Sequence, residues 1–234
     1  MPRTAVLIAA AGRGERLGPG TPKALRLLGG TPMLVHAVRA VAASRQVDLV
    51  VVAAPEQAVG FVSSTLAEHS FSAEVTVVPG GSTRQDSVAR ALITLPDDVD
   101  VVLVHDAARP LVPADVVSAV VGAVRAGAAA VVPGLPVVDT VKRVDVDDLV
   151  LDTVDRSQLR AIQTPQGFRR SVLQAAHASV DPDDVATDDA GLVERMGQPV
   201  RVVPGHEEAF KVTRPFDLLV AEAVLARRRA AGEI

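Results

Sequence analysis

Residues 5–23 read AVLIAAAGRGERLGPGTPK, a short apolar run that passes directly into a loop rich in glycine and basic residues. The apolar part, Ala5–Ala11, is continuous rather than alternating, which is typical of a strand buried on both faces of a sheet. It is too short to span a membrane, and the charged stretch Gly12–Arg16 follows at once. A buried strand followed by a glycine-rich loop is typical of the start of a doubly wound α/β domain.

The rest of the chain repeats this alternation of strand and helix. Expected strands are 5–11, 47–54, 74–78, 99–105, 128–132 and 200–203. Expected helices are 32–44, 56–69, 83–95, 113–126, 171–178, 187–196 and 215–229. Ser82 and Pro113 suit helix starts, and Gly127 and Gly197 suit helix ends. The order predicts one three-layer α/β/α domain over residues 1–234, with its ligand crevice beyond the carboxyl ends of the strands.

One segment departs from the alternation. Residues 137–156 carry Asp145, Asp147 and Asp148 between two Val- and Leu-rich flanks, which predicts a β-hairpin rather than a crossover helix. Its apolar positions need a cover, and a second copy of the chain would supply one. The hairpin therefore predicts a homodimer.

The composition excludes several classes of protein. With 48% hydrophobic residues, 22% charged residues and a net charge of -4, the chain lacks the positive field of a nucleic-acid binder. It has five phenylalanines, no tyrosine and no tryptophan, so it has little aromatic surface on which bases could stack. The absence of cysteine rules out disulfides and thiolate metal sites and fits a cytoplasmic protein. We expect a small-molecule partner, with no nucleic acid and no membrane.

Three motifs lie where expected strands end. In AAAGRGERLGPGTPK, residues 9–23, glycines let backbone N–H groups approach phosphates, and Arg16 and Lys23 add cations; the alternative is a solvated loop. In GGSTRQDS, residues 80–87, backbone groups could read a base edge, or Ser82 could simply cap a helix. In HDAARP, residues 105–110, Asp106 suits Mg²⁺ and Arg109 suits a phosphate. A local Asp106–Arg109 ion pair beside a near-core His105 is the alternative.

A further group of polar residues follows later in the chain: Thr164 in TPQ, Thr187 in ATDDAG and Lys211 in FKVTRP. Hydroxyls and a lysine could form a pocket for a phosphate and a polyol, although Thr187 would serve equally well as a helix cap. We assign no function to Arg227–Arg229, which suit the exposed end of the last helix.

Taken together and in order, the motifs resemble those of the 2-C-methyl-D-erythritol 4-phosphate cytidylyltransferases of the non-mevalonate isoprenoid pathway. The resemblance covers essentially the whole chain and includes VVDTVKR, TVDRSQL and TDDAGLVE besides the motifs above. It implies a Rossmann-like nucleotidyltransferase domain, a homodimer formed by an exchanged β-arm, CTP as donor and Mg²⁺ as cofactor. The nearest alternative is a cytidylyltransferase for a pentitol phosphate such as ribitol 5-phosphate. A non-catalytic nucleotide-binding domain and a nicotinamide-dependent dehydrogenase are more distant alternatives.

The resemblance also implies a role for individual residues. The catalytic residues would be Arg16, Lys23 and Lys211. The CTP site would comprise Ala10, Ala11, Gly12, Gly81, Ser82, Ser87 and Asp106, with Asp106 also at the metal. The acceptor pocket would comprise Arg109, Thr164, Thr187 and Lys211, together with Thr140 and Arg156 from the partner's arm. Ser82 stands where the family commonly has an acidic residue, and Ala9 where it usually has proline.

Overall fold

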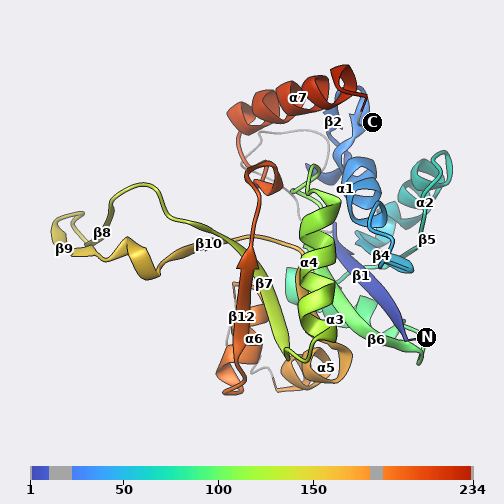
Figure 1. Cartoon of the computed structure of the whole chain (residues 1–234). Coiled ribbons are helices and arrows are strands. Elements are labelled where there is room, and N and C mark those ends of the chain that lie inside the picture. The colour runs from blue at the N-terminus through green and yellow to red at the C-terminus, as the bar shows by residue number, and fades with distance from the viewer. Residues whose placement is uncertain (1, 11–22, 180–186, 233–234) are drawn as a thin grey trace.

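The computed structural model describes residues 2–10, 23–179 and 187–232, which form a central twisted sheet covered by helices (Figure 1). Its parallel strands are β1 (Arg3–Ala9), β4 (Leu49–Ala54), β5 (Glu74–Pro79), β6 (Val99–Asp106), β7 (Ala130–Pro136) and β12 (Val200–Pro204). β1 lies at the centre, between β4 and β6. The expected strands are therefore all present.

Two strands of the main sheet were not predicted, and neither were β2 (Leu27–Leu28) and β3 (Thr31–Pro32), which form a separate two-stranded sheet. β10 (Arg160–Ile162) and β11 (Gln166–Arg169) run antiparallel to β7, and β11 separates β7 from β6. The sheet is consequently mixed rather than purely parallel. Both strands are very short and contain few β-branched residues, so the sequence carries almost no strand signal there.

Burial follows the position of each strand in the sheet. β1, β4 and β6 are buried almost throughout, as their continuous apolar runs predicted. The same expectation was wrong for β5 and β12, which are half exposed: among the described residues each pairs with a neighbour on one edge alone, so each lies at a margin of the sheet.

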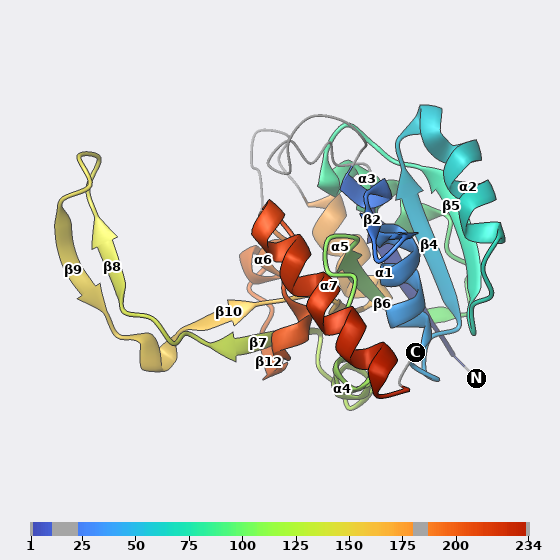
Figure 2. The same cartoon turned by 90° about the horizontal axis from the view of Figure 1, so that it is seen from above.

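Helices cover both faces of the sheet, which gives the three expected layers (Figure 2). One apolar core lies under α1 (Met33–Ala42), α2 (Val59–Ala67) and α4 (Ala114–Arg125). The other lies under α3 (Arg84–Ile93), α5 (Arg170–Ala178) and α6 (Asp189–Arg195). A third, smaller cluster joins α7 (Pro215–Ala230) to the start of α1. Among the described residues, no helix is long and apolar enough to cross a membrane.

The helix ends are partly as predicted. Gly127 and Gly197 follow α4 and α6 with φ of 111° and 72°, values that favour glycine. At α3 the cap is Thr83 rather than Ser82, because Thr83 and Asp86 form a reciprocal capping box. At α6 the cap is Asp188 rather than Thr187, because the Asp188 carboxylate accepts the Gly191 N–H.

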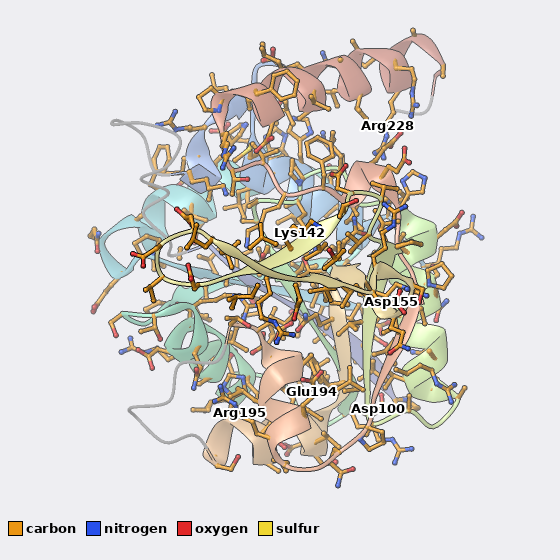
Figure 3. All side chains as sticks on the ribbon, turned by 90° about the vertical axis from the view of Figure 1, so that its left-hand side faces the viewer. Asp100, Lys142, Asp155, Glu194, Arg195 and Arg228 are labelled. Atoms are coloured by element: carbon orange, nitrogen blue, oxygen red, sulfur yellow. The ribbon has the colours of Figure 1, made fainter. Side chains whose placement is uncertain are left out.

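The predicted hairpin projects from the body of the molecule (Figures 1 and 2). β8 (Val141–Val144) and β9 (Val150–Val154) form a separate two-stranded sheet. Figure 3 looks toward this arm, with Lys142 and Asp155 labelled on it. Val146 is 99% exposed, and Leu149, Val150 and Leu151 are each about 60% exposed. The arm thus carries an apolar surface that nothing in the described part of the chain covers.

Candidate active site

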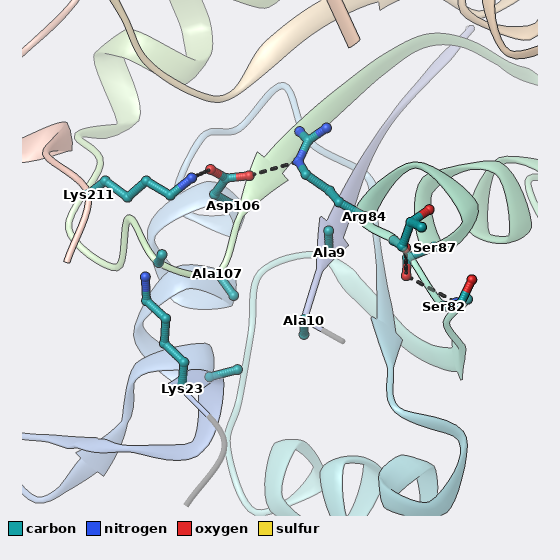
Figure 4. A pocket seen from close by; sticks show the side chains of 13 residues that line it. Ala9, Ala10, Lys23, Ser82, Arg84, Ser87, Asp106, Ala107 and Lys211 are labelled. Atoms are coloured by element: carbon teal, nitrogen blue, oxygen red, sulfur yellow. Dashed lines mark hydrogen bonds and ion pairs between the residues drawn. The ribbon is translucent and has the colours of Figure 1, made fainter. Parts of the chain in front are cut away.

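A cavity of about 190 Å³ lies at the carboxyl ends of β1 and β6, where the topology predicted a ligand crevice (Figure 4). The segments around it are the end of β1, the short helix η2 (Lys23–Leu25), the loop before α3, the end of β6 and the chain before α7. Its lining residues are Ala9, Ala10, Lys23, Ala24, Gly81, Ser82, Thr83, Arg84, Ser87, Asp106, Ala107, Ala108 and Lys211.

Asp106 occupies the end of β6, opposite Ala9 of β1. One carboxylate oxygen accepts a hydrogen bond from Lys211 Nζ at 2.7 Å, and the other accepts one from Arg84 Nε at 3.2 Å. Burial raises the pKa of Asp106, but the charges of Arg84 and Lys211 outweigh it and hold the pKa well below its usual value. The carboxylate is therefore ionised at neutral pH.

A buried hydrogen-bond chain supports Asp106 from beneath. The Asp106 N–H donates to Thr164 Oγ1 at 3.1 Å, and Thr164 Oγ1 lies 2.9 Å from His105 Nδ1. Burial lowers the pKa of His105 to about 4, so the ring is neutral at neutral pH. Neutral His105 accepts from Thr164 and donates from Nε2 to the Arg109 carbonyl, 3.2 Å away. His105 is thus a buried histidine whose two ring nitrogens both have hydrogen-bond partners, as the alternative interpretation of HDAARP predicted.

The loop before α3 is fastened by its own side chains. Gly81 N–H donates to Ser87 Oγ at 3.0 Å, Ser87 Oγ donates to the Thr83 carbonyl, and Ser82 Oγ donates to Asp86 at 2.6 Å. A Cβ on Gly81 would lie 2.1 Å from the Asp86 Cβ, so this position requires glycine. The loop therefore presents a fixed backbone edge to the cavity.

Of the two cations expected in the glycine-rich loop, Arg16 and Lys23, the described residues include Lys23. Lys23 lies in η2 and extends along the same side of the cavity as Lys211 (Figure 4). Ala11, Gly12 and Arg16 lie outside the described residues.

Five residues expected in the acceptor pocket do not line the cavity: Arg109, Thr140, Arg156, Thr164 and Thr187. The Arg109 guanidinium donates to the carbonyls of Ala209 and Ile162, at 2.6 and 3.3 Å. The suggested Asp106–Arg109 ion pair was therefore wrong. Thr164 also lies behind the cavity, beneath Asp106.

The two arm residues and Thr187 lie elsewhere. Thr140 is exposed at the base of the arm, and Arg156 donates to the Val138 carbonyl of its own chain. Thr187 is exposed just before α6.

The sequence interpretation missed Arg84, which lines the cavity and pairs with Asp106. Its one available signal was its place in GGSTRQDS, as the first residue of a helix at the carboxyl end of the sheet. Its second partner, Asp189, lies 105 positions away and could not be inferred from spacing.

The donor set limits how a metal could bind. Among the described residues, no cluster of three or more His, Cys, Asp and Glu side chains is present. Asp106 is a single ionised carboxylate in the cavity wall. Mg²⁺ at nucleotide sites is typically bound by one or two carboxylates together with substrate phosphates, so Asp106 fits that mode and not an all-protein cage.

Comparison with known proteins agrees with this geometry. Residues 4–227 match the family described as IspD, 2-C-methyl-D-erythritol 4-phosphate cytidylyltransferase. The cytidylyltransferase of that name from Streptomyces coelicolor is 61% identical over 235 residues, covering 97% of this chain and 86% of the relative. The corresponding crystal structure from Thermus thermophilus matches with a TM-score of 0.76 and 38% identity, covering 95% of this chain and 98% of that one.

A second solved structure, the 4-diphosphocytidyl-2C-methyl-D-erythritol synthase from Anaerococcus prevotii, matches with a TM-score of 0.83 and 26% identity over 96% of both chains. Both structural matches thus span nearly the whole chain. The chain belongs to the 2-C-methyl-D-erythritol 4-phosphate cytidylyltransferase family.

Proposed function

We propose that the cavity lined by Lys23, Asp106 and Lys211 is the active site, and that separate groups of its residues bind CTP, Mg²⁺ and the acceptor. The chain transfers CMP from CTP to 2-C-methyl-D-erythritol 4-phosphate, giving 4-diphosphocytidyl-2-C-methyl-D-erythritol and pyrophosphate in the non-mevalonate pathway. The site proposal rests on one observation: Lys23, Arg84 and Lys211 line a single cavity at the carboxyl ends of the strands, and Arg84 and Lys211 both pair with the ionised Asp106 there.

The chemistry needs cations more than it needs a base. The acceptor phosphate carries about -1.5 to -2 charges at neutral pH, so it is already a nucleophile. Its approach to the α-phosphorus brings two anions together while charge builds toward pyrophosphate. Positioned cations oppose both effects, as in other phosphoryl transfers. We assign this role to Lys23 and Lys211, with Arg16 from the glycine-rich loop.

The nucleotide half of the site follows from the fixed loop before α3. The backbone edge at Gly81 and Ser82, held by Ser87, supports assignment of this loop to the cytosine. Ala10 at the end of β1, followed by Ala11 and Gly12, is assigned to the triphosphate. Ser82 already donates to Asp86, so its backbone rather than its hydroxyl would read the base.

We assign Mg²⁺ to Asp106. Bound there with the nucleotide phosphates, it would neutralise part of their charge. The low pKa of Asp106 supports this assignment, because the carboxylate needs no proton removed before it binds a cation. Lys211 and Arg84 keep the carboxylate facing the cavity.

The acceptor half is proposed to be completed by a second copy of the chain. Arg109, Thr164, Thr187 and Lys211 would supply one side, and Thr140 and Arg156 of the partner's arm the other. The apolar arm surface supports a homodimer, because leaving it in water is unfavourable. We treat residues 1–234 as one domain in each copy, with 137–156 as its dimerisation arm.

Pyrophosphate release across a small panel tests the proposal. With CTP and Mg²⁺, we expect release with 2-C-methyl-D-erythritol 4-phosphate and much less with ribitol 5-phosphate. ATP or GTP replacing CTP with equal kcat/KM would remove the cytosine assignment for Gly81 and Ser82. Equal kcat/KM with ribitol 5-phosphate would remove the proposed acceptor pocket.

A further inference from the structure

Arg84 lies between two carboxylates that are far apart in the chain. Its Nε donates to Asp106 Oδ1 at 3.2 Å, and one terminal nitrogen donates to Asp189 Oδ2 at 2.6 Å. Asp106 lines the cavity, whereas the Asp189 side chain is 1% exposed. The guanidinium therefore connects the cavity wall to the protein interior.

Asp189 is itself held in place. Its second oxygen lies 2.9 Å from His177 Nε2, on α5. It is the first residue of α6, and Gln166 of β11 fastens that helix start by donating to Asp188 and accepting from the Ala190 N–H. Asp189 therefore cannot shift without disturbing both α6 and the central sheet.

We propose that Arg84 is a positioning residue which, anchored by Asp189, fixes the orientation of the Asp106 carboxylate and thereby the place of Lys211. Each Asp106 oxygen has one cationic partner, Arg84 or Lys211. With Arg84 removed, the carboxylate could rotate and carry the flexible lysine with it. The inference rests on the roles proposed above for Asp106 and Lys211.

The charge pattern explains why an anchoring carboxylate is useful. Lys211, Asp106, Arg84 and Asp189 form a row of alternating charges. Since Asp189 shares the Arg84 guanidinium, Arg84 alone does not neutralise Asp106. Asp106 thus keeps negative charge for Lys211 and for a cation in the cavity, while Arg84 stays fixed by a two-sided contact.

The central test is Arg84→Ala with chemical rescue. We expect kcat to fall on the order of 10- to 100-fold, since small misplacements of reacting groups cost about that much. Arg84 lines the cavity and its side chain is 30% exposed, so added guanidinium ion can reach the vacated space. At concentrations far below those that unfold the protein, guanidinium should restore much of kcat. If Arg84 had only a structural role, added guanidinium should lower the activity of Arg84→Ala further, because guanidinium weakens folding.

Arg170→Ala is the matched control. Arg170 is also the first residue of a helix and also partly buried, but it donates to the carbonyls of Leu95, Pro96 and Val99, away from the cavity. Its loss should lower the melting temperature, leave kcat per folded enzyme nearly unchanged and show no rescue by guanidinium. Equal kcat losses in both variants, with no rescue of Arg84→Ala, would overturn the inference.

Asp189→Asn tests the anchor without emptying space. It should lower kcat, and the double variant with Arg84→Ala should be no slower than Arg84→Ala alone, because Asp189 acts through Arg84. Wild-type kcat in folded Asp189→Asn would contradict the inference. Asp106→Asn and Lys211→Ala, measured in parallel, separate the two proposals: if these also retain activity, the site assignment itself is wrong.

Discussion

Asp106 and Lys211 form a 2.7 Å ion pair although they lie 105 positions apart in the chain. The lysine reaches Asp106 from a segment anchored by the Val212 N–H, which donates to the Ala108 carbonyl at 2.8 Å. Carboxylate and backbone contacts together place this cation beside the cavity. The pair therefore offers the most direct tests of how the site works.

Lys211→Ala should lower kcat on the order of 100-fold and also raise the KM of the acceptor, because the cation is assigned to both acceptor binding and the transition state. Lys23→Ala should lower mainly kcat. Steady-state kinetics with each substrate varied separately measures both effects. A Lys23→Ala enzyme that is folded and keeps kcat within a few-fold of wild type would exclude the transition-state role.

Thr164→Val should destabilise the fold by about 1–3 kcal/mol, because the buried Asp106 N–H loses its acceptor while side-chain volume is conserved. It should also lower kcat, since Thr164 supports Asp106. Urea denaturation followed by circular dichroism measures the stability. Thr94→Val, at the exposed end of α3, is the control and should change the free energy of unfolding by much less. Equal losses in the two variants would contradict the proposed support.

Gly81→Ala should raise the KM for CTP, roughly tenfold, because its Cβ would collide with Asp86 and displace the loop assigned to the cytosine. Gly122→Ala in α4 has open space around the new Cβ and should raise stability by up to about 1 kcal/mol. The KM for CTP should stay unchanged in this control. An unchanged KM for CTP in Gly81→Ala would contradict the assignment of the cytosine to this loop.

The pKa of His105, lowered to about 4 by burial, predicts a pH dependence of stability. Between pH 6.5 and 4 the unfolded chain binds a proton that the folded protein does not, so stability falls as pH falls, by about 3 kcal/mol across that window. In His105→Asn, the slope of the unfolding free energy against pH should be smaller, by the amount that corresponds to nearly one bound proton. Leu173→Ala, a buried apolar control, should lower stability without changing the slope. Matching slopes in wild type and His105→Asn would contradict this.

Mixed dimers test whether two chains share each site. Lys23→Ala and Arg156→Ala homodimers should both be poor enzymes. In a mixed dimer one site has both lesions and the other has none, so random exchange at equal amounts should recover roughly a quarter of wild-type activity. Mixing Lys23→Ala with Lys211→Ala is the control: both line the same chain's cavity, so every mixed site keeps one lesion and activity should not recover.

The outcome of that experiment decides the role of Arg156. No recovery in the first mixture, after mass spectrometry verifies exchange, would leave Arg156 as a support for the Val138 carbonyl in its own chain.

The alternation of apolar runs and helices was enough to predict the layers of the fold and the position of the cavity. It was not enough for β10 and β11, because three or four residues with little β-propensity form strands when a neighbouring strand offers free backbone groups. The helix cap at Thr83 was missed for a related reason: Ser82 and Thr83 both suit an N-cap, and the reciprocal contact with Asp86 decides between them.

The site shows the same division between local and distant information. Lys23, Gly81, Asp106 and Lys211 belong to recognisable motifs, and the structure brings all of them to one cavity. The contact between Arg84 and Asp189 depends instead on how α3 and α6 pack on one face of the sheet. No local sequence pattern encodes that packing, so the pairing of Arg84 with Asp189 could be found only from the structure.

The place of Lys211 in the chain also bears on the order in which the enzyme forms. The last described strand of the sheet, β12, ends at Pro204, so all the described strands precede this lysine. Contacts between segments so distant in sequence are slow to form. During synthesis, β1, β4, β5 and β6 can be in place before the lysine leaves the ribosome, because Asp106 at the end of β6 precedes it by 105 positions. The newly made protein would then pass through a folded but inactive stage, which ends when the segment around Val212 docks on Ala108.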